Sequence, residues 1–363
     1  MGTHTAGQHG NTSPGSRPRP TLSALLAVAA LAWGGMAWAQ ATAPADEPRP
    51  AELQAKARAL ARAHAAVVGL RSVAVDDAVS IRSLGRQRQG SGVVIDDDGS
   101  LVLTIGYLVL EAEQVEIQLD GGRSFPARVV AYDQATGFGL VQSLAPLPLP
   151  SAPFGRSSAL DTNEPLMIAS GGSDGDLSLA RLVSRRAFSG YWEYHIEGAL
   201  FTAPPRGDHS GAGLFNADGE LLGIGSLVVA DALGQDGAPM TGNMFVPIDL
   251  LKPILGELRE RGSSRLSHRP WMGVNCVARD GQVRVLRVTD DSPAEAAGLR
   301  PGDHIVAIDG TPVASLEAFY KALWAGSSPE REVRLDVRRS GEGRTVTVQA
   351  VDRERSLRKA QGI

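Results

Sequence analysis

Residues 90–104, GSGVVIDDDGSLVLT, contain the pattern that decides the fold. Two short apolar runs, VVI and LVL, flank Asp98-Gly99, which is a turn signal typical of a β-hairpin. Residues 209–224, HSGAGLFNADGELLGI, repeat the pattern around Asp218-Gly219. Many short strands joined by glycine turns are typical of β-barrels and β-sandwiches. The sequence therefore predicts a mainly β fold that is built from repeated hairpins.

The chain around these hairpins divides into several parts. Strong helix formers fill residues 51–66, a Pro-rich stretch at 145–153 separates two β halves, and Gly262 ends a helical segment that Pro247 opens. An α+β unit with strand and helix patterns follows a polar linker. The expected organisation is a targeting segment at 1–39, a linker and helix at 40–72, a double β unit at 73–250, a connecting helix and linker at 251–268, the α+β unit at 269–352 and a tail at 353–363.

The N-terminal segment has the pattern of a secretory signal peptide. Arg17 and Arg19 precede the apolar run TLSALLAVAALAWGGMAWA at 21–39, and Ala37-Trp38-Ala39 fits a cleavage site before Gln40. The apolar core is short for a bilayer span, so an uncleaved membrane anchor is the weaker alternative. We therefore expect an exported protein of the bacterial periplasm.

Composition excludes several functional classes. The 363 residues carry 36 Lys and Arg against 40 Asp and Glu, and a net charge of −4 gives no electrostatic footprint for nucleic acid. Cys276 is the single cysteine, so intramolecular disulfides and CxxC motifs are excluded, and we expect it to be a buried packing residue. No cluster has metal-ligand spacing and no glycine loop fits a phosphate, so neither a metal nor a cofactor is expected.

Four segments resemble one known protease family. The hairpins at 90–104 and 209–224 resemble the first hairpin and the nucleophile segment of HtrA/DegP-type serine proteases. FVPIDLLKPIL followed by RPWMGV resembles their connector, and SPAEAAGLRPGDHIVAIDGTPV at 292–313 is similar to the core of their PDZ domain. The resemblance implies a chymotrypsin-like double β-barrel at 73–250 and an α+β PDZ domain at 269–352.

The resemblance also maps the catalytic positions onto this sequence. Ser210 stands at the nucleophile position, Tyr107 at the position of the triad histidine and Gly137 at that of the triad aspartate. A serine hydroxyl is a weak nucleophile and needs a general base that a third group orients. Asp208 replaces the glycine of the oxyanion hole, where a carboxylate opposes stabilisation of a developing negative charge. The sequence therefore predicts an unactivated serine.

A substitute base is hard to find in the sequence. No lysine occurs between Lys56 and Lys252, and the phenol of Tyr107 has an ordinary pKa near 10. The side chain of His209 is expected to diverge from its sequence neighbour Ser210. His195 is the remaining candidate, because it precedes the nucleophile loop.

The PDZ segment offers a binding site. PDZ domains add an extended peptide as a strand and hold its terminal carboxylate with backbone N–H groups. By resemblance, Trp271, Met272, Gly273 and Val274 form this carboxylate-binding loop.

These features predict an exported HtrA-like pseudoprotease that binds polypeptides or partner proteins through its PDZ domain. One alternative is an active serine endopeptidase that uses Ser210 with a non-standard base. Another is a regulatory subunit of an active HtrA-type protease. The expected partners are unfolded polypeptides or protein C termini, an active family protease for the last alternative, and further copies of the chain, since family members form trimers. No nucleic acid is expected.

Overall fold

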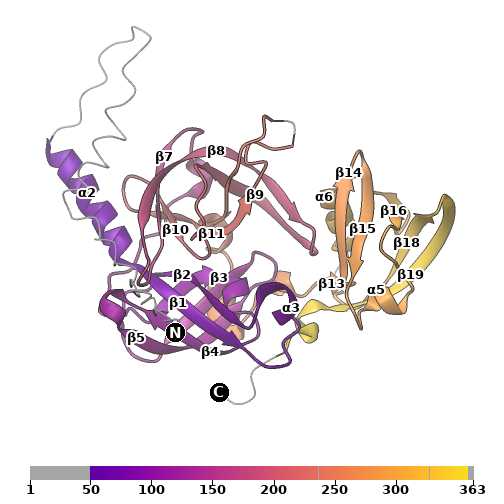
Figure 1. Ribbon diagram of the computed structural model, residues 1–363, viewed down its shortest axis with the longest axis horizontal. Helices are drawn as coiled ribbons and strands as arrows, with labels where there is room; N and C mark the ends of the chain where they lie inside the picture. Colours follow the sequence, from indigo (N-terminus) through magenta and orange to yellow (C-terminus); the bar gives the residue numbers. More distant parts are fainter. Residues whose placement is uncertain (1–49, 236, 327, 359–363) are drawn as a thin grey trace, which may run out of the picture.

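The computed structural model describes residues 50–235, 237–326 and 328–358. The predicted signal peptide at 1–39 and its cleavage site lie outside the described residues. Within them, no helix is both long and apolar enough to cross a membrane. Figure 1 shows helix α2 at one end, two barrels in the middle and a third β unit at the other end.

The first barrel closes from six antiparallel strands in the order β1-β2-β3-β6-β5-β4. The hairpin predicted at 90–104 is present, and Val93 pairs with Leu103 across it. The barrel begins at Val67 rather than at residue 73, because Val68 and Leu70 already point into its core. Its elements are α2 (Pro50–Ala65), β1 (Val67–Ala74), α3 (Ile81–Leu84), β2 (Gln87–Val94), β3 (Leu101–Ile105), η1 (Gly106–Leu108), β4 (Ala112–Gln118), η2 (Asp120–Gly122), β5 (Ser124–Tyr132) and β6 (Phe138–Ser143).

The second barrel repeats this closure in the order β10-β11-β12-β9-β8-β7. The Pro-rich stretch at 145–153 has no helix or strand and connects the two barrels, as the composition predicts. The long β8–β9 hairpin reaches from this barrel toward the third unit (Figure 1). The elements are η3 (Ser157–Ala159), β7 (Pro165–Ala169), β8 (Leu177–Gly190), β9 (Tyr194–Ala203), β10 (Gly213–Phe215), β11 (Leu221–Val229) and β12 (Gly242–Pro247).

The connector differs from the predicted continuous helix. Helix α4 begins only at Leu255, because Pro253 lacks an N–H and disfavours helical geometry at Lys252. Its end is as predicted, since Gly262 adopts φ 83° and its N–H returns to the Leu258 carbonyl. The connector comprises η4 (Ile248–Leu250), α4 (Leu255–Arg261) and η5 (Arg265–Ser267).

The C-terminal unit is a sheet in the order β13-β19-β18-β16-β15-β14 with two helices, and β17 pairs with β16. Met272, Phe319 and Tyr320 lie in its own hydrophobic core, which is separate from those of the barrels. The double barrel and this α+β unit confirm the predicted fold class. The elements are β13 (Pro270–Trp271), β14 (Val274–Arg279), β15 (Gln282–Val288), α5 (Pro293–Ala296), β16 (His304–Ile308), β17 (Thr311–Pro312), α6 (Leu316–Leu323), β18 (Arg331–Arg339), β19 (Glu342–Asp352) and η6 (Arg353–Ser356).

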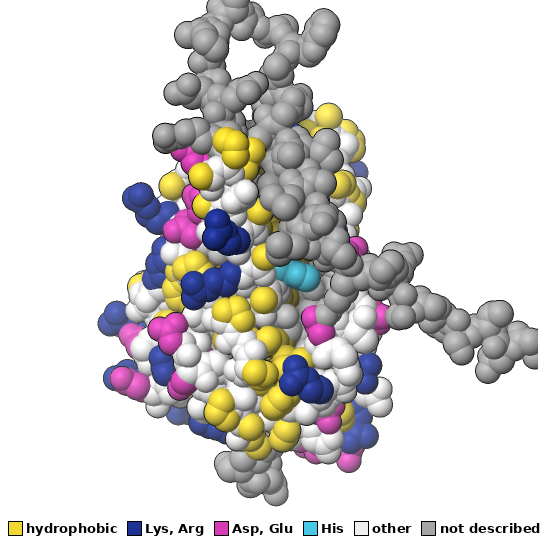
Figure 2. Space-filling view, turned by 90° about the vertical axis from the view of Figure 1, so that its left-hand side faces the viewer, with side chains coloured by type: hydrophobic (Ala, Val, Ile, Leu, Met, Phe, Trp, Pro, Cys, Tyr) yellow, Lys and Arg dark blue, Asp and Glu magenta, His cyan; other side chains and the backbone are white. Residues whose placement is uncertain are grey.

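The surface carries mixed charge. On the side of the molecule shown in Figure 2, basic and acidic side chains lie interspersed with hydrophobic ones.

His268 in the connector contacts Asp352 at 2.8 Å, and this hydrogen bond raises the pKa of the imidazole above its ordinary value. The contact links the connector to the last strand of the C-terminal unit.

A buried carboxylate ties the connector to the first barrel. Asp133 is fully buried and accepts hydrogen bonds from the Thr136 hydroxyl at 2.6 Å, the Ser264 hydroxyl at 2.5 Å and the Ser267 hydroxyl at 2.6 Å. Buried charges are tolerated in protein interiors only when such partners satisfy them. Asp133 therefore fixes both the β5–β6 turn and the chain that leads to the C-terminal unit.

Asp133→Ala is expected to lower the free energy of unfolding by about 3 kcal/mol, because it leaves several buried hydroxyl groups without their charged acceptor. Urea denaturation followed by circular dichroism measures the change. Asp174→Ala is the matched control, since Asp174 is exposed and its loss should change stability by less than about 0.5 kcal/mol. Equal stability of the two variants would contradict the role given to Asp133.

Candidate active site

Ser210 lies in the loop between β9 and β10, at the contact between the two barrels. Its carbonyl accepts a hydrogen bond from the Ser91 N–H at 2.8 Å, which fixes the loop against strand β2. Gly211 has φ 74°, and a Cβ atom there would lie 1.9 Å from the Ser91 carbonyl oxygen. Only glycine fits at this position, so the loop holds Ser210 in one place.

Tyr107 of η1 reaches Ser210 from the first barrel. Its hydroxyl lies 2.7 Å from the Ser210 Oγ and 2.8 Å from the Ser226 carbonyl oxygen. A carbonyl can only accept, and the phenol has one proton, which it therefore donates to Ser226. The Ser210 hydroxyl then donates its proton to the phenol oxygen. The structure thus brings Tyr107 and Ser210 together.

The phenol cannot act as the general base. Burial raises the pKa of Tyr107 to about 12, and the hydrogen bond with Ser210 only partly opposes the rise. The phenolate is therefore a minor species at neutral pH. A neutral phenol oxygen is a very weak proton acceptor for the Ser210 hydroxyl.

Gly137, which the family resemblance aligns with the triad aspartate, has no side chain. It lies in the β5–β6 turn with φ 84°, and its carbonyl accepts from the Gly106 N–H at 2.7 Å. A Cβ atom at this position would lie 2.9 Å from the hydroxyl oxygen of Tyr194. That hydroxyl donates to the Thr136 carbonyl at 2.5 Å. Tyr194 thus occupies the space next to the missing carboxylate, which sequence reasoning did not find.

The two histidines weighed as substitute bases are engaged elsewhere. The Nδ1 of His195 lies 2.8 Å from the Ser189 hydroxyl and its Nε2 lies 3.2 Å from a carboxylate oxygen of Glu197. The Nδ1 of His209 lies 3.1 Å from the Arg206 carbonyl, to which it can only donate. Neither contact directs the imidazole to Ser210.

Asp208, which the family resemblance places at the oxyanion-hole position, has its charge paired. Asp208 accepts from the Ser170 hydroxyl at 2.5 Å and from the Arg206 Nε at 2.8 Å. Although burial raises the pKa of the Asp208 carboxyl, these hydrogen bonds hold it below its ordinary value. Asp208 is therefore ionised at neutral pH. The positive charge of Arg206 weakens the repulsion expected between Asp208 and an oxyanion. The sequence did not indicate this role of Arg206.

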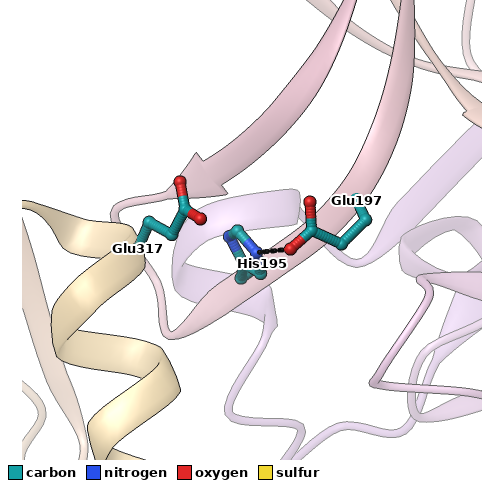
Figure 3. A group of neighbouring side chains, drawn as sticks. All are labelled: His195, Glu197 and Glu317. Atoms are coloured by element: carbon teal, nitrogen blue, oxygen red, sulfur yellow. Dashed lines mark hydrogen bonds and ion pairs between the residues drawn. The ribbon is translucent and has the colours of Figure 1, made fainter.

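A cluster of titratable groups lies where the β8–β9 hairpin meets helix α6. Ligand atoms of His195, Glu197 and Glu317 lie within 4.8 Å of one another (Figure 3). The ammonium group of Lys321 already contacts Glu197 at 2.8 Å and Glu317 at 2.6 Å. A metal ion would have to displace this lysine, so the cluster is an ion-pair network between the two elements.

The loop from Trp271 to Val274 lies at the start of the C-terminal unit, and its N–H groups converge on a side chain of the same protein. Those of Met272, Gly273 and Val274 donate to the carboxylate of Glu193 at 3.2, 2.7 and 2.9 Å. Gly273 has φ 86°, which turns its N–H inward. Burial raises the pKa of Glu193, and Arg353 and the three N–H groups oppose the rise. Sequence reasoning missed Glu193, because the contact joins segments about 80 residues apart.

Comparisons with known proteins agree with this architecture. A model of the trypsin-like peptidase domain matches residues 90–224, and a PDZ domain model matches residues 270–350. HhoA of Synechocystis sp., which is named as a serine protease, is 32% identical over 72% of this chain and 70% of its own length. The chain belongs to the HtrA/DegP-like serine protease family.

Other members of the HtrA/DegP-like family are more distant or longer. The periplasmic serine endoprotease DegP of Escherichia coli K12 is 29% identical over 63% of this chain, which corresponds to 50% of DegP. The solved structure of the HtrA-type protease AlgW with a decapeptide has a TM-score of 0.52 and 22% identity, over 82% of this chain and 98% of AlgW. At this identity the structural match shows a shared fold.

Proposed function

We propose that this HtrA/DegP-like chain is a non-catalytic member of its family that binds polypeptides or partner proteins through its PDZ domain. The observation that carries the proposal is the 2.7 Å contact of Ser210 with the Tyr107 phenol, where an activated serine requires a base. The relatives are named as proteases, and the family resemblance implies that this chain replaces the base and its orienting group at positions 107 and 137.

The binding half of the proposal rests on the PDZ domain. Its carboxylate-binding loop has the inward N–H groups that a terminal carboxylate needs, and the groove beside it has the strand β14 for strand addition. Structures of the relative AlgW are described with a decapeptide or a tripeptide. We therefore propose free protein C termini with apolar last residues as the ligand class.

The proposed location is the periplasm. The curated DegP relatives are named as periplasmic, and the signal-peptide pattern at 1–39 supports export of this chain. The segment from Gln40 onward would then be the exported form.

Fluorescence anisotropy with a labelled decapeptide tests the proposal. A peptide that ends in valine with a free carboxylate is expected to bind at least about tenfold more tightly than its C-terminal amide, because the amide loses a charge-assisted contact. Mass spectrometry after long incubation should find both peptides intact. Equal affinity of the two forms would contradict the carboxylate loop, and cleavage that depends on Ser210 would contradict the non-catalytic role.

A further inference from the structure

The turn between β8 and β9 lies in the groove of the PDZ domain. We propose that this turn, Gly190 to Glu193, is an internal ligand of the groove and that a protein C terminus must displace it in order to bind. The inference rests on the proposed function, because it assigns a competitor to the same peptide site. It is carried by contacts that reproduce the carboxylate and main-chain hydrogen bonds of PDZ recognition.

The first contact typical of PDZ recognition is that of a carboxylate with the carboxylate-binding loop. The side chain of Glu193 accepts from the N–H groups of Met272, Gly273 and Val274, the three donors that the loop offers to a peptide terminus. Glu193 is only 2% exposed. A carboxylate this buried is strongly penalised unless donors satisfy it. Glu193 and an incoming terminal carboxylate therefore compete for the same three N–H groups.

The second part is the strand. The N–H of Cys276 on β14 donates to the carbonyl of Tyr191 at 2.9 Å, two residues before the carboxylate-bearing Glu193. Strand addition uses such main-chain bonds beside the carboxylate contact. The turn therefore makes a main-chain bond to β14 in addition to its contacts with the loop.

The third group of contacts joins the turn to the opposite wall of the groove. The hydroxyl of Tyr320 on α6 donates to the Gly190 carbonyl at 2.7 Å and accepts from the Glu193 N–H at 3.2 Å. Arg353 donates to the carbonyls of Glu193 and Trp192 at 2.7 and 3.2 Å. Polar groups of the turn are thus satisfied from both sides of the groove, as expected for a bound ligand.

The ion-pair network of Figure 3 lies on the same hairpin and the same helix. His195 and Glu197 come from β9, and Glu317 comes from α6. The side chains of Glu197 and Lys321 are 61% and 53% exposed, so their ion pair adds little stability. Glu197 is therefore a matched control, because its loss alters the same interface without touching the carboxylate-binding loop.

A tethered ligand is a strong competitor. Two segments of one chain meet at an effective concentration of about the millimolar range. When the internal ligand occupies the groove, the apparent affinity for an external peptide is reduced in proportion to the fraction of molecules whose groove is open. Removal of the Glu193 carboxylate is therefore expected to tighten peptide binding at least about tenfold. The β8–β9 hairpin also carries Tyr194, which lies beside Gly137. Displacement of the turn would therefore move a residue that contacts the candidate active site.

The first test needs no peptide. Hydrogen exchange of the full chain, read by mass spectrometry over the segment from Met272 to Cys276, is expected to be at least about tenfold faster in Glu193→Gln and faster still in Glu193→Ala. The glutamine variant keeps the volume of the side chain and guards against a folding defect. Glu197→Gln should exchange like the wild type. Unchanged exchange in both Glu193 variants would overturn the inference.

The second test uses the labelled decapeptide ending in valine. We expect Glu193→Gln to bind it at least about tenfold more tightly than the wild type and Glu197→Gln do. If the wild type already binds as tightly as Glu193→Gln, the internal ligand does not compete and the inference is wrong. A third outcome separates this inference from the proposed function. If exchange increases as expected, but neither the wild type nor Glu193→Gln binds the free-carboxylate peptide more tightly than its amide, the turn is docked in the groove and the proposed ligand class is wrong.

Discussion

Ser210→Ala is expected to leave the behaviour of this chain toward unfolded casein unchanged. In both forms casein should remain intact after long incubation, because the Ser210 proton is held by a neutral phenol and no side chain at position 137 orients a base. Loss of a nucleophile or base from an intact triad lowers kcat by about 10⁶-fold. Turnover should therefore be at least about 10⁶-fold below that of an intact family triad.

Gel electrophoresis and mass spectrometry of the casein measure this outcome. DegP of Escherichia coli, treated identically, is the positive control for the assay. Casein fragments that appear with the wild type and vanish with Ser210→Ala would mean that a base reaches Ser210. His195 would then be the first residue to test, although its contacts with Ser189 and Glu197 direct it elsewhere.

A rebuilt triad is expected to give the second large effect. Tyr107→His restores a base beside Ser210, and Gly137→Asp restores its orienting carboxylate. The structure adds a third change, Tyr194→Phe, because a Cβ atom at position 137 would lie 2.9 Å from the Tyr194 hydroxyl. Asp208→Gly restores the glycine of the oxyanion position. A positioned base contributes about 10²–10⁴-fold, so the quadruple variant should cleave casein at least about 10²-fold faster than the wild type.

Two matched variants make the rescue interpretable. Ser210→Ala in the rebuilt background should abolish the gain, and retention of Tyr194 should weaken it, since the new aspartate then has no room. Circular dichroism establishes that the variants are folded. A folded quadruple variant without Ser210-dependent cleavage would show that the positions 107 and 137 are not the missing triad members.

The fold and the contact between Tyr107 and Ser210 are readable from local sequence and the family resemblance. The Asp98-Gly99 hairpin and its repeat near the nucleophile predict the barrels, and the family motifs place Tyr107 opposite Ser210, although 103 residues separate them. These features are readable because turn residues, alternating strands and motif spacing act over a few neighbouring positions.

Three contacts that shape the two sites were not readable. Tyr194 fills the space beside Gly137, Arg206 neutralises Asp208, and Glu193 occupies the PDZ loop. The Tyr194 and Glu193 contacts depend on how the β8–β9 hairpin packs on other parts of the chain. The Arg206 contact depends on the conformation of its own loop, and no periodicity or motif near these residues reports any of the three. The connector helix was also placed too early, because the effect of Pro253 outweighed the favourable residues around it.

The state of Ser210 can be measured directly with a fluorophosphonate probe, which reacts covalently with activated serines. Intact-mass spectrometry of the native chain should show no adduct under conditions that fully label DegP, and the quadruple variant should gain one adduct that Ser210→Ala removes. Stoichiometric labelling of Ser210 in the native chain would contradict the account, because it would require a base that the phenol of Tyr107 does not supply.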